Sequence, residues 1–436
     1  MSATWAERIP LAVFVAAYLS FVFKPNLRAW AACAAAIALL ILGWAGAIPW
    51  SQSLGEVIQW NVLALMAGMM VIAHVFEQSR IPAVLAEMLV DRSPDARWAF
   101  IWITALISVL SMFLDNVSCV LLIAPVALSL ARKLGANPVR PVICLAVAAN
   151  LQGAATLIGD PPSMLLAGHM KLSFNDFFFY QGKPSMFWVM QAGALASGAV
   201  VFWVLRAFHR PNELVACERA RSWTPLWLIV CLVAVLAAAS SFDPGFVWFA
   251  GSASLVFAAV AALWAVKRAR WCGVRALLTA VDFTTLFFLM GMFVLVEGLD
   301  EARWMERIAS ALHALVGGSL FGAFAALVVF SVLVSAVVDN VPFLLAMLPV
   351  VGTLARQFSP ADAPDGKLPL LMFALLAGAC LGGNITPIGA SANVVAMGIL
   401  RKAGHPVSFP GFMRIGVPFT LAALLAGAGL IWLVWA

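Results

Sequence analysis

The chain of 436 residues is a succession of apolar runs, many of them long enough to cross a lipid bilayer. A membrane-spanning helix needs about 20 apolar residues, and such runs recur from Ile9–Phe23 to Phe412–Trp435. Charged residues make up 11% of the chain, whereas soluble domains contain about 25%. This pattern excludes a soluble enzyme and a nucleic-acid-binding domain. It predicts an all-α polytopic membrane protein that has lipid as its surroundings.

Three motifs of the first half recur in the same order in the second half, at offsets of 223, 224 and 230 residues. The pairs are Leu63-Ala-Leu-Met-Ala-Gly-Met69 with Leu286-Phe-Phe-Leu-Met-Gly-Met292, Phe113-Leu-Asp-Asn-Val117 with Val337-Val-Asp-Asn-Val341, and Gln152-Gly-Ala-Ala-Thr-Leu-Ile-Gly159 with Gly382-Gly-Asn-Ile-Thr-Pro-Ile-Gly389. Ordered matches of this kind indicate an internal duplication. We therefore expect two repeats, residues 1–208 and 224–436, joined by a polar cytoplasmic linker at 209–223.

Two segments of each half do not fit a single straight helix. Residues 97–131 and 319–355 are too long, and each has an aspartate near its middle. A carboxylate at the bilayer centre costs about 2.5–3.5 kcal/mol, so we expect each segment to fold back as a re-entrant hairpin with a protein-lined tip. Residues 141–168 and 368–400 contain glycine, threonine and proline, which predicts helices broken inside the membrane.

If the hairpins return to their own side, five crossings remain in each half, about ten in all, and the second half is inverted relative to the first. The basic residues agree with this count. Loops expected opposite the N-terminus carry 19 of the 26 Lys and Arg residues, among them Lys24, Arg28, Arg140 and Lys402. By the positive-inside rule, both termini are expected outside the cell, or inner, membrane.

The duplicated breaks place polar side chains at the predicted midplane. We expect the ion- or substrate-binding residues to be Asp115, Asn116, Asn150, Thr156, Asp160, Asp339, Asn340, Asn384, Thr386, Ser391 and Asn393. Hard oxygen ligands suit Na⁺, and a desolvated carboxylate can hold H⁺ instead. Competition between Na⁺ and H⁺ for one carboxylate is a physical basis for coupled transport.

Several of these residues also have purely structural interpretations. Asp160 and Ser391 could cap a half-helix, Asn116 and Asn340 could cap the returning hairpin arms, and Thr156 and Thr386 could bond within their own helices. His74 and Glu297 occupy matching repeat positions, so a proton relay is one hypothesis and a place at the membrane interface is the other. The seven cysteines form no CxxC or Cys/His cluster, so no metal site and no cofactor are expected.

Three long motifs carry a family resemblance. Leu114–Pro125 and Asn150–Pro162, with Gly382–Asn393 in the second half, resemble the signatures of the ArsB/NhaD branch of the ion transporter superfamily, and within it the P-protein type. The resemblance covers residues 57–168 and 282–434. It implies the inverted-repeat fold with re-entrant hairpins, a citrate-transporter-like domain, a possible homodimer and elevator-like movement.

The related sodium/dicarboxylate symporters carry Ser-Asn-Thr at both hairpin tips, whereas this chain carries Asp-Asn-Val. Two aspartates would repel a di- or tricarboxylate, so the residues favour a cation (Na⁺)/H⁺ antiporter that uses alternating access and is not an enzyme. An arsenite or antimonite exporter and an organic-anion permease remain alternatives. An intramembrane aspartyl protease is a remote one, because neither aspartate lies in the Gly-x-Gly-Asp motif of such enzymes.

Overall fold

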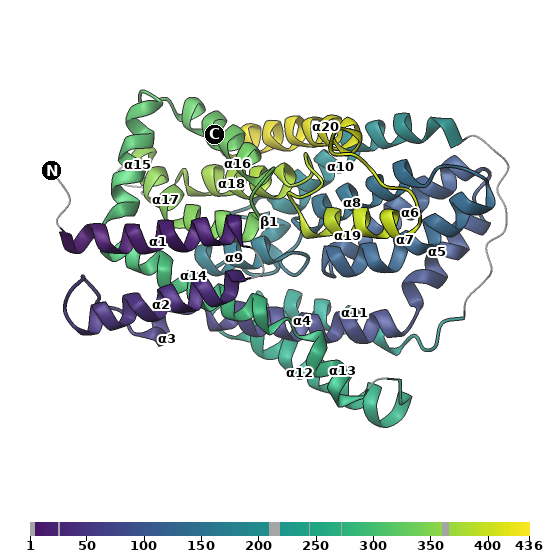
Figure 1. The fold of residues 1–436 in the computed structure, drawn as a ribbon, viewed down its shortest axis with the longest axis horizontal. Coiled ribbons are helices and arrows are strands. Elements are labelled where there is room, and N and C mark those ends of the chain that lie inside the picture. The colour runs from purple at the N-terminus through teal and green to yellow at the C-terminus, as the bar shows by residue number, and fades with distance from the viewer. Residues whose placement is uncertain (1–4, 25–26, 209–218, 244, 272, 360–365) are drawn as a thin grey trace.

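The computed structural model describes residues 5–24, 27–208, 219–243, 245–271, 273–359 and 366–436. Most of the predicted linker, residues 209–218, lies outside this part. The described chain is a bundle of helices, most of which run along the long axis of the molecule (Figure 1). Its described strands, β1 (Phe179–Tyr180) and β2 (Lys183–Pro184), form one short antiparallel hairpin, which the all-α prediction did not include.

The described part of the first half contains ten α-helices and two short 3-10 turns. They are α1 (Trp5–Phe23), α2 (Arg28–Trp44), α3 (Leu54–Val57), α4 (Trp60–Gln78), α5 (Ile81–Asp91), α6 (Ala96–Ser111), α7 (Asn116–Lys133), α8 (Val139–Gly153), α9 (Pro161–Met170), η2 (Asn175–Phe177), α10 (Met186–Leu205) and η3 (Arg206–Phe208).

The described part of the second half repeats this order of helices, including a short helix at the place of α3. Its helices are α11 (Thr224–Ala239), α12 (Phe249–Leu263), η4 (Trp264–Ala269), α13 (Val274–Ala280), α14 (Phe283–Glu301), α15 (Trp304–Leu315), α16 (Leu320–Ser335), α17 (Asn340–Phe358), α18 (Leu368–Gly382), α19 (Ser391–Lys402) and α20 (Phe409–Trp435).

Each over-long apolar segment is divided into two helices. Residues 97–131 are occupied by α6 and α7, which meet at the turn 112–115, and residues 319–355 by α16 and α17, which meet at 336–339. The segments 141–168 and 368–400 are interrupted at 154–160 and 383–390. Proline begins α9, and threonine and glycine lie within both interruptions, so the helical hydrogen-bond ladder stops there.

Two helices, α5 and α15, do not coincide with any of the predicted apolar runs. Helix α15 carries Glu306, Arg307 and His313 among its apolar residues, and such a two-sided helix has no continuous apolar stretch to find. In Figure 1 it runs across the long axis at one end of the molecule, and its axis is bent by 113° from that of α16.

By length and composition, seven helices of the described chain could cross a membrane, or eight if α15 and α16 count as one bent span. Five more apolar helices have 10–17 residues, namely α2, α6, α8, α11 and α18. Because breaks and hairpins shorten individual helices, these lengths leave the expected ten crossings as a prediction.

Helices of one half pack against helices of the other half through close contacts between small residues. Gly291 of α14 packs on Ala32 of α2, and Gly68 of α4 packs on Ser254 of α12, each so tightly that an added Cβ would lie within 3.0 Å of its neighbour. Small residues allow helix backbones to approach in a membrane, where van der Waals contact replaces the hydrophobic effect. The central part of the chain is therefore built from both halves together.

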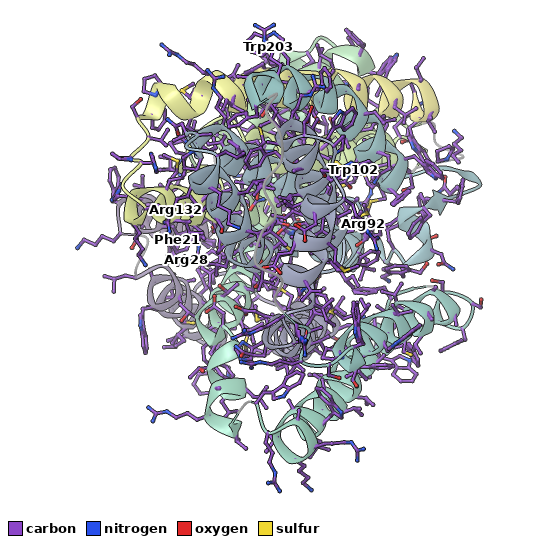
Figure 2. The ribbon with its side chains drawn as sticks, turned by 90° about the vertical axis from the view of Figure 1, so that its right-hand side faces the viewer. Phe21, Arg28, Arg92, Trp102, Arg132 and Trp203 are labelled. Carbon is purple, nitrogen blue, oxygen red and sulfur yellow. The ribbon has the colours of Figure 1, made fainter. Side chains whose placement is uncertain are left out.

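Several tryptophans lie on the outside of this bundle. Trp102 of α6 and Trp203 of α10 are 47% and 57% exposed, and both lie at the outer surface in Figure 2. Such exposed aromatic side chains are typical of lipid-facing and interfacial positions, as expected for a protein surrounded by a bilayer.

Candidate functional site

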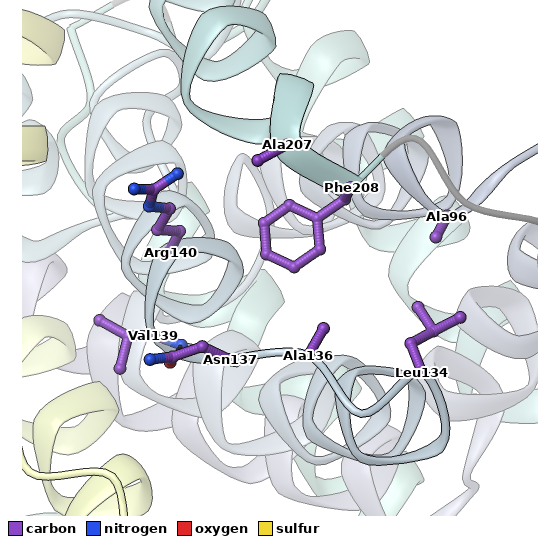
Figure 3. A pocket seen from close by; sticks show the side chains of 8 residues that line it. All are labelled: Ala96, Leu134, Ala136, Asn137, Val139, Arg140, Ala207 and Phe208. Carbon is purple, nitrogen blue, oxygen red and sulfur yellow. Dashed lines mark hydrogen bonds between the residues drawn. The ribbon is translucent and has the colours of Figure 1, made fainter.

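A cavity of about 370 Å³ lies where the open ends of α6 and α7 approach the start of α8 and η3. Figure 3 shows Phe208 pointing into the space between Arg140 and Leu134. Arg140 is the single ionisable residue among those that line it. With a guanidinium and no carboxylate in its lining, this cavity does not suit a cation.

A second cavity, of about 450 Å³, lies at the tips of both hairpins, and we call it the central cavity. It contains five acidic residues, Glu77, Asp115, Asp160, Asp282 and Asp339, against one guanidinium, that of Arg28, and one imidazole, that of His74. The remaining predicted site residues that line it are Asn116, Asn150, Asn340 and Ser391. The structure thus brings both halves of the predicted site to one cavity.

The first hairpin tip is fastened to the interruption between α8 and α9. The hydroxyl of Thr156 donates a hydrogen bond to the carbonyl oxygen of Met112 in the tip. A Cβ on Gly159 would lie 2.5, 2.8 and 2.9 Å from the carbonyl oxygens of Gly153, Ser111 and Met112. Thr156 therefore bonds to the hairpin, not within its own helix, and Gly159 permits the close approach.

The second tip is fastened in the same way. Thr386 donates to the carbonyl oxygen of Ala336, and a Cβ on Gly389 would lie 2.7, 2.9 and 3.0 Å from the carbonyl oxygens of Gly383, Ser335 and Ala336. In each half, therefore, the hairpin tip and the broken helix are joined through main-chain contacts that a side chain would disrupt.

The hairpin aspartates, not the asparagines beside them, cap the returning arms. The Asp115 carboxylate accepts a hydrogen bond from the Ser118 amide at 3.0 Å, and that of Asp339 from the Val341 amide at 3.1 Å. The cap interpretation of Asn116 and Asn340 is therefore wrong: the helices begin at these residues. Each aspartate places its charge beside the positive end of a helix.

The cap interpretation is also wrong for the broken helices. Asp160 precedes α9, but its side chain makes no capping hydrogen bond. The N-cap residue of α19 is Ala390, so Ser391 is already the first helical residue and does not cap the helix. The Asp160 carboxyl group is instead a buried group, 8% exposed, that borders the central cavity.

The three remaining asparagines form a buried bridge between the halves. Asn150 Nδ2 of α8 donates to Asn384 Oδ1 at 2.8 Å and to Asn393 Oδ1 at 2.9 Å. Asn384 donates to the Val147 carbonyl at 3.0 Å, and Asn393 to the carbonyls of Gly383 and Thr386, both at 2.9 Å. These hydrogen bonds connect the two broken helices.

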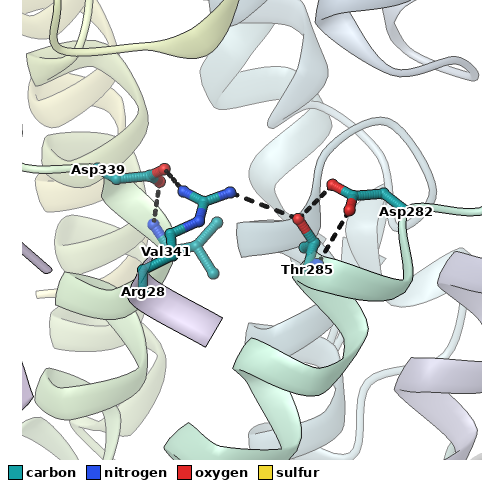
Figure 4. Close-up of polar contacts among 5 residues, drawn as sticks. All are labelled: Arg28, Asp282, Thr285, Asp339 and Val341. Atoms are coloured by element: carbon teal, nitrogen blue, oxygen red, sulfur yellow. Dashed lines mark hydrogen bonds and ion pairs between the residues drawn. The ribbon is translucent and has the colours of Figure 1, made fainter. Parts of the chain in front are cut away.

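Arg28 joins the first helices of the chain to the second hairpin (Figure 4). Its Nη1 lies 2.9 Å from Asp339 Oδ2, and its Nη2 lies 3.4 Å from the Thr285 hydroxyl. Thr285 in turn donates to Asp282 Oδ2 at 2.5 Å. The topology prediction counted Arg28 as a loop cation, but its side chain, 30% exposed, lines the central cavity.

The proposed relay residues are not equivalent in the structure. His74 lines the central cavity with its Nδ1 3.7 Å from Glu77 Oε2. Glu297 is absent from the cavity lining, although its position in α14 matches that of His74 in α4. The matching positions in sequence therefore do not place the two side chains in one cavity.

Sequence reasoning missed Glu77, Asp282 and Thr285, as well as the role of Arg28. One signal was present: Asp282 directly precedes an apolar run and has Thr285 three residues later, a helix-start pattern. Its place in the cavity depends on how α14 packs against α2 across about 250 residues of chain, which local patterns do not report.

The central cavity has a closed side. It borders α4 only from Met66 onward, whereas a Cβ on Gly168 of α9 would lie 2.1 Å from Gln59 Oε1 and 2.7 Å from Val62 Cγ2 at the start of α4. Gly398 of α19 matches Gly168 at the offset of 230, yet a Cβ there would meet nothing within 4 Å. The two halves are thus similar in sequence but packed differently.

Comparison with known proteins places this arrangement in a family. The citrate transporter family, CitMHS, matches residues 18–365 and again residues 273–436. The chain belongs to this family. An uncharacterized transporter of Mycobacterium tuberculosis is 32% identical over 98% of both chains. The P protein of Mus musculus is 28% identical over 96% of this chain and 59% of its own length.

Two solved structures share the fold. The YdaH transporter of Alcanivorax borkumensis has a TM-score of 0.58 at 16% identity, covering 86% of this chain and 84% of its own. MtrF of Neisseria gonorrhoeae, described among antimetabolite efflux pumps, has a TM-score of 0.57 at 15% identity, covering 85% and 80%. This chain is therefore a multi-pass membrane transporter, and its assignment to the ArsB/NhaD branch remains a prediction.

Proposed function

We propose that this transporter exchanges a cation, Na⁺, for H⁺ by alternating access. The observation that carries the proposal is the excess of carboxylates in the central cavity, where five acidic residues face one guanidinium. A cavity of this charge attracts cations and repels multiply charged anions. Oxygen ligands of the kind found here suit Na⁺, and the same carboxylates accept a proton when the cation leaves.

Asp115 and Asp160 are the carboxylates we assign to the exchanged ion. Both line the central cavity, and among the described contacts neither forms an ion pair, whereas Asp339 is paired with Arg28. A single ion held between these two groups would be replaced by H⁺ when the cation dissociates. Such competition ties the movement of one ion to the other.

Alternating access is supported by the different packing of the two halves. We propose that residues 1–208 and 224–436 are inverted repeats, one closed and one open in this conformation. At the repeat offsets of 223 and 230 residues, Val62 corresponds to Thr285 and Gly168 to Gly398. The contact between Val62 and Gly168 seen here therefore corresponds to a contact between Thr285 and Gly398 in the opposite conformation. A Val62→Cys/Gly168→Cys pair should cross-link here, and a Thr285→Cys/Gly398→Cys pair in the opposite conformation. Cross-linking of both pairs in one locked population would contradict this mechanism.

The test of ion exchange uses purified protein in liposomes that contain a pH-sensitive dye. Added Na⁺ should move protons in the wild type, and Asp115→Asn should abolish the response because an amide cannot bind H⁺. Glu306→Gln is the matched control, since this acidic residue is exposed on α15, away from the cavity. A wild type that ignores Na⁺, Li⁺ and K⁺ would refute the proposal.

The family match favours one other candidate, the uptake of an organic anion such as citrate. Arg28 supplies the one guanidinium of the central cavity that a carboxylate could bind. The five acidic residues make a free trianion a poor ligand, so such a substrate would need to enter protonated or complexed with a cation. Uptake of radiolabelled citrate in the same liposomes, with and without divalent cations, distinguishes this candidate from Na⁺/H⁺ exchange.

A further inference from the structure

The guanidinium of Arg28 is held in place by helices α1, α2 and α14. It lies 5.4 Å from the centre of the Phe288 ring of α14 and contacts Thr285 of the same helix. Phe288 meets Phe21 of α1 edge to face at 5.2 Å. A cation over an aromatic face beside a hydroxyl acceptor has a preferred place even before it meets a carboxylate. The side chain is therefore positioned by the helices around it.

Its partner, Asp339, belongs to a different part of the structure. Asp339 ends the tip of the second hairpin, and that tip is fastened to the interruption between α18 and α19 through Thr386 and Gly389. The Arg28–Asp339 ion pair, 2.9 Å long, thus connects the α1–α2–α14 group to the second hairpin and broken helix. The side chains are 30% and 34% exposed, and ion pairs with this access to water are weak enough to separate.

Among the described residues that line the central cavity, Arg28 is the one arginine or lysine, so Asp115 of the first hairpin has no such partner there. Ala32 of α2 packs on Gly291, and Ser254 of α12 packs on the matching Gly68. These contacts align α2 with α12, so that Arg28, four residues before Ala32, corresponds to Ala250, four residues before Ser254. An alanine cannot neutralise a carboxylate. The two tip aspartates are therefore alike in sequence and different in their surroundings.

We propose that Arg28 is a tethered counter-ion that occupies Asp339 and so confines the exchanged cation to Asp115 and Asp160. The inference rests on the proposed cation exchange. It means that the two hairpins have different roles, because only the aspartate of the second hairpin is neutralised by Arg28. With its charge neutralised from within the protein, Asp339 takes no ion from solution in this conformation. Any movement of the second hairpin away from α2 must first separate the pair, so Arg28 also resists that movement.

The first experiment measures the Na⁺ concentration that gives a half-maximal proton response in liposomes. Asp339→Asn leaves a guanidinium without its counter-charge in the cavity, which should raise that concentration about tenfold, equivalent to about 1.4 kcal/mol of repulsion. Arg28→Gln/Asp339→Asn should return it to within about threefold of wild type, because neither charge remains. Lys24→Gln, which removes an exposed cation just before α2, should behave as wild type. A double variant as impaired as Asp339→Asn would overturn the proposal.

A second measurement does not depend on the transported ion. Thermal midpoints of wild type, Arg28→Gln, Asp339→Asn and the double variant form a double-mutant cycle. If the two side chains interact directly, the double variant should lose less in thermal midpoint than the sum of the losses of the two single variants. Arg28→Lys should recover part of the loss seen in Arg28→Gln. Additive losses would overturn the tether. Coupling in this cycle without a Na⁺ response in the wild type would instead refute only the proposed exchange.

Discussion

Gly159 offers the sharpest test of how the first hairpin is held against the broken helix. In Gly159→Ala the new methyl group would lie 2.5, 2.8 and 2.9 Å from three main-chain carbonyl oxygens. These oxygens belong to helix ends and to the hairpin tip, so no side chain can rotate to make room. Overpacking of this kind costs about 1–3 kcal/mol, and we expect the upper end of that range because all three contacts are with backbone.

Gly398→Ala is the matched control. It lies inside α19, the second half-helix of the other repeat, and its Cβ would meet nothing within 4 Å. An alanine inside a helix is about 0.5–1 kcal/mol more favourable than glycine, so this variant should be as stable as wild type or slightly more stable. The two substitutions are chemically identical. Because their surroundings differ, they should have opposite effects on stability.

The assay is thermal unfolding of the purified variants in one detergent at one scan rate, since membrane proteins often unfold irreversibly. Gly159→Ala should melt clearly below wild type and lose transport, because the hairpin tip and Asp160 would shift relative to each other. Equal midpoints for Gly159→Ala and Gly398→Ala would refute the idea that the tip and the broken helix are joined through close main-chain contact.

Three further predictions concern the asparagine bridge, the threonine contacts and the orientation. Asn150→Leu leaves two buried amide oxygens without donors and should lower stability by about 2 kcal/mol or more, measured by the same melting assay. Thr156→Val and Thr386→Val should each cost about 1 kcal/mol, and their losses should add because the two contacts are separate; a strongly non-additive double variant would contradict this. With native cysteines replaced, Lys183→Cys should react with a membrane-impermeant thiol reagent added to whole cells, and Lys402→Cys should react only after lysis; the reverse pattern would invert the proposed orientation.

The elements of the fold were predictable where one residue type breaks an apolar run. Asp115 and Asp339 interrupt apolar runs that would otherwise continue as one helix, and the prolines after Asp160 begin a new helix after the break. Scarcity of charge made these aspartates visible, because a carboxylate in an apolar segment needs a protein-lined site. Helices α5 and α15 were not predicted for other reasons: α5 has only 11 residues, and the charged residues of α15 interrupt its apolar sequence.

The sequence by itself determined that this chain is a membrane protein, where its helices break and which carboxylates lie at the breaks. These properties depend on local composition and on the main-chain limits of proline and glycine. Only the tertiary structure decided which charges meet. Arg28 and Asp339 are 311 residues apart, and their contact follows from the packing of α2 on α14 and of the second hairpin on its broken helix. Similar halves can thus have different electrostatics, because a side chain's charge acts on its neighbours in space, and those neighbours are set by packing.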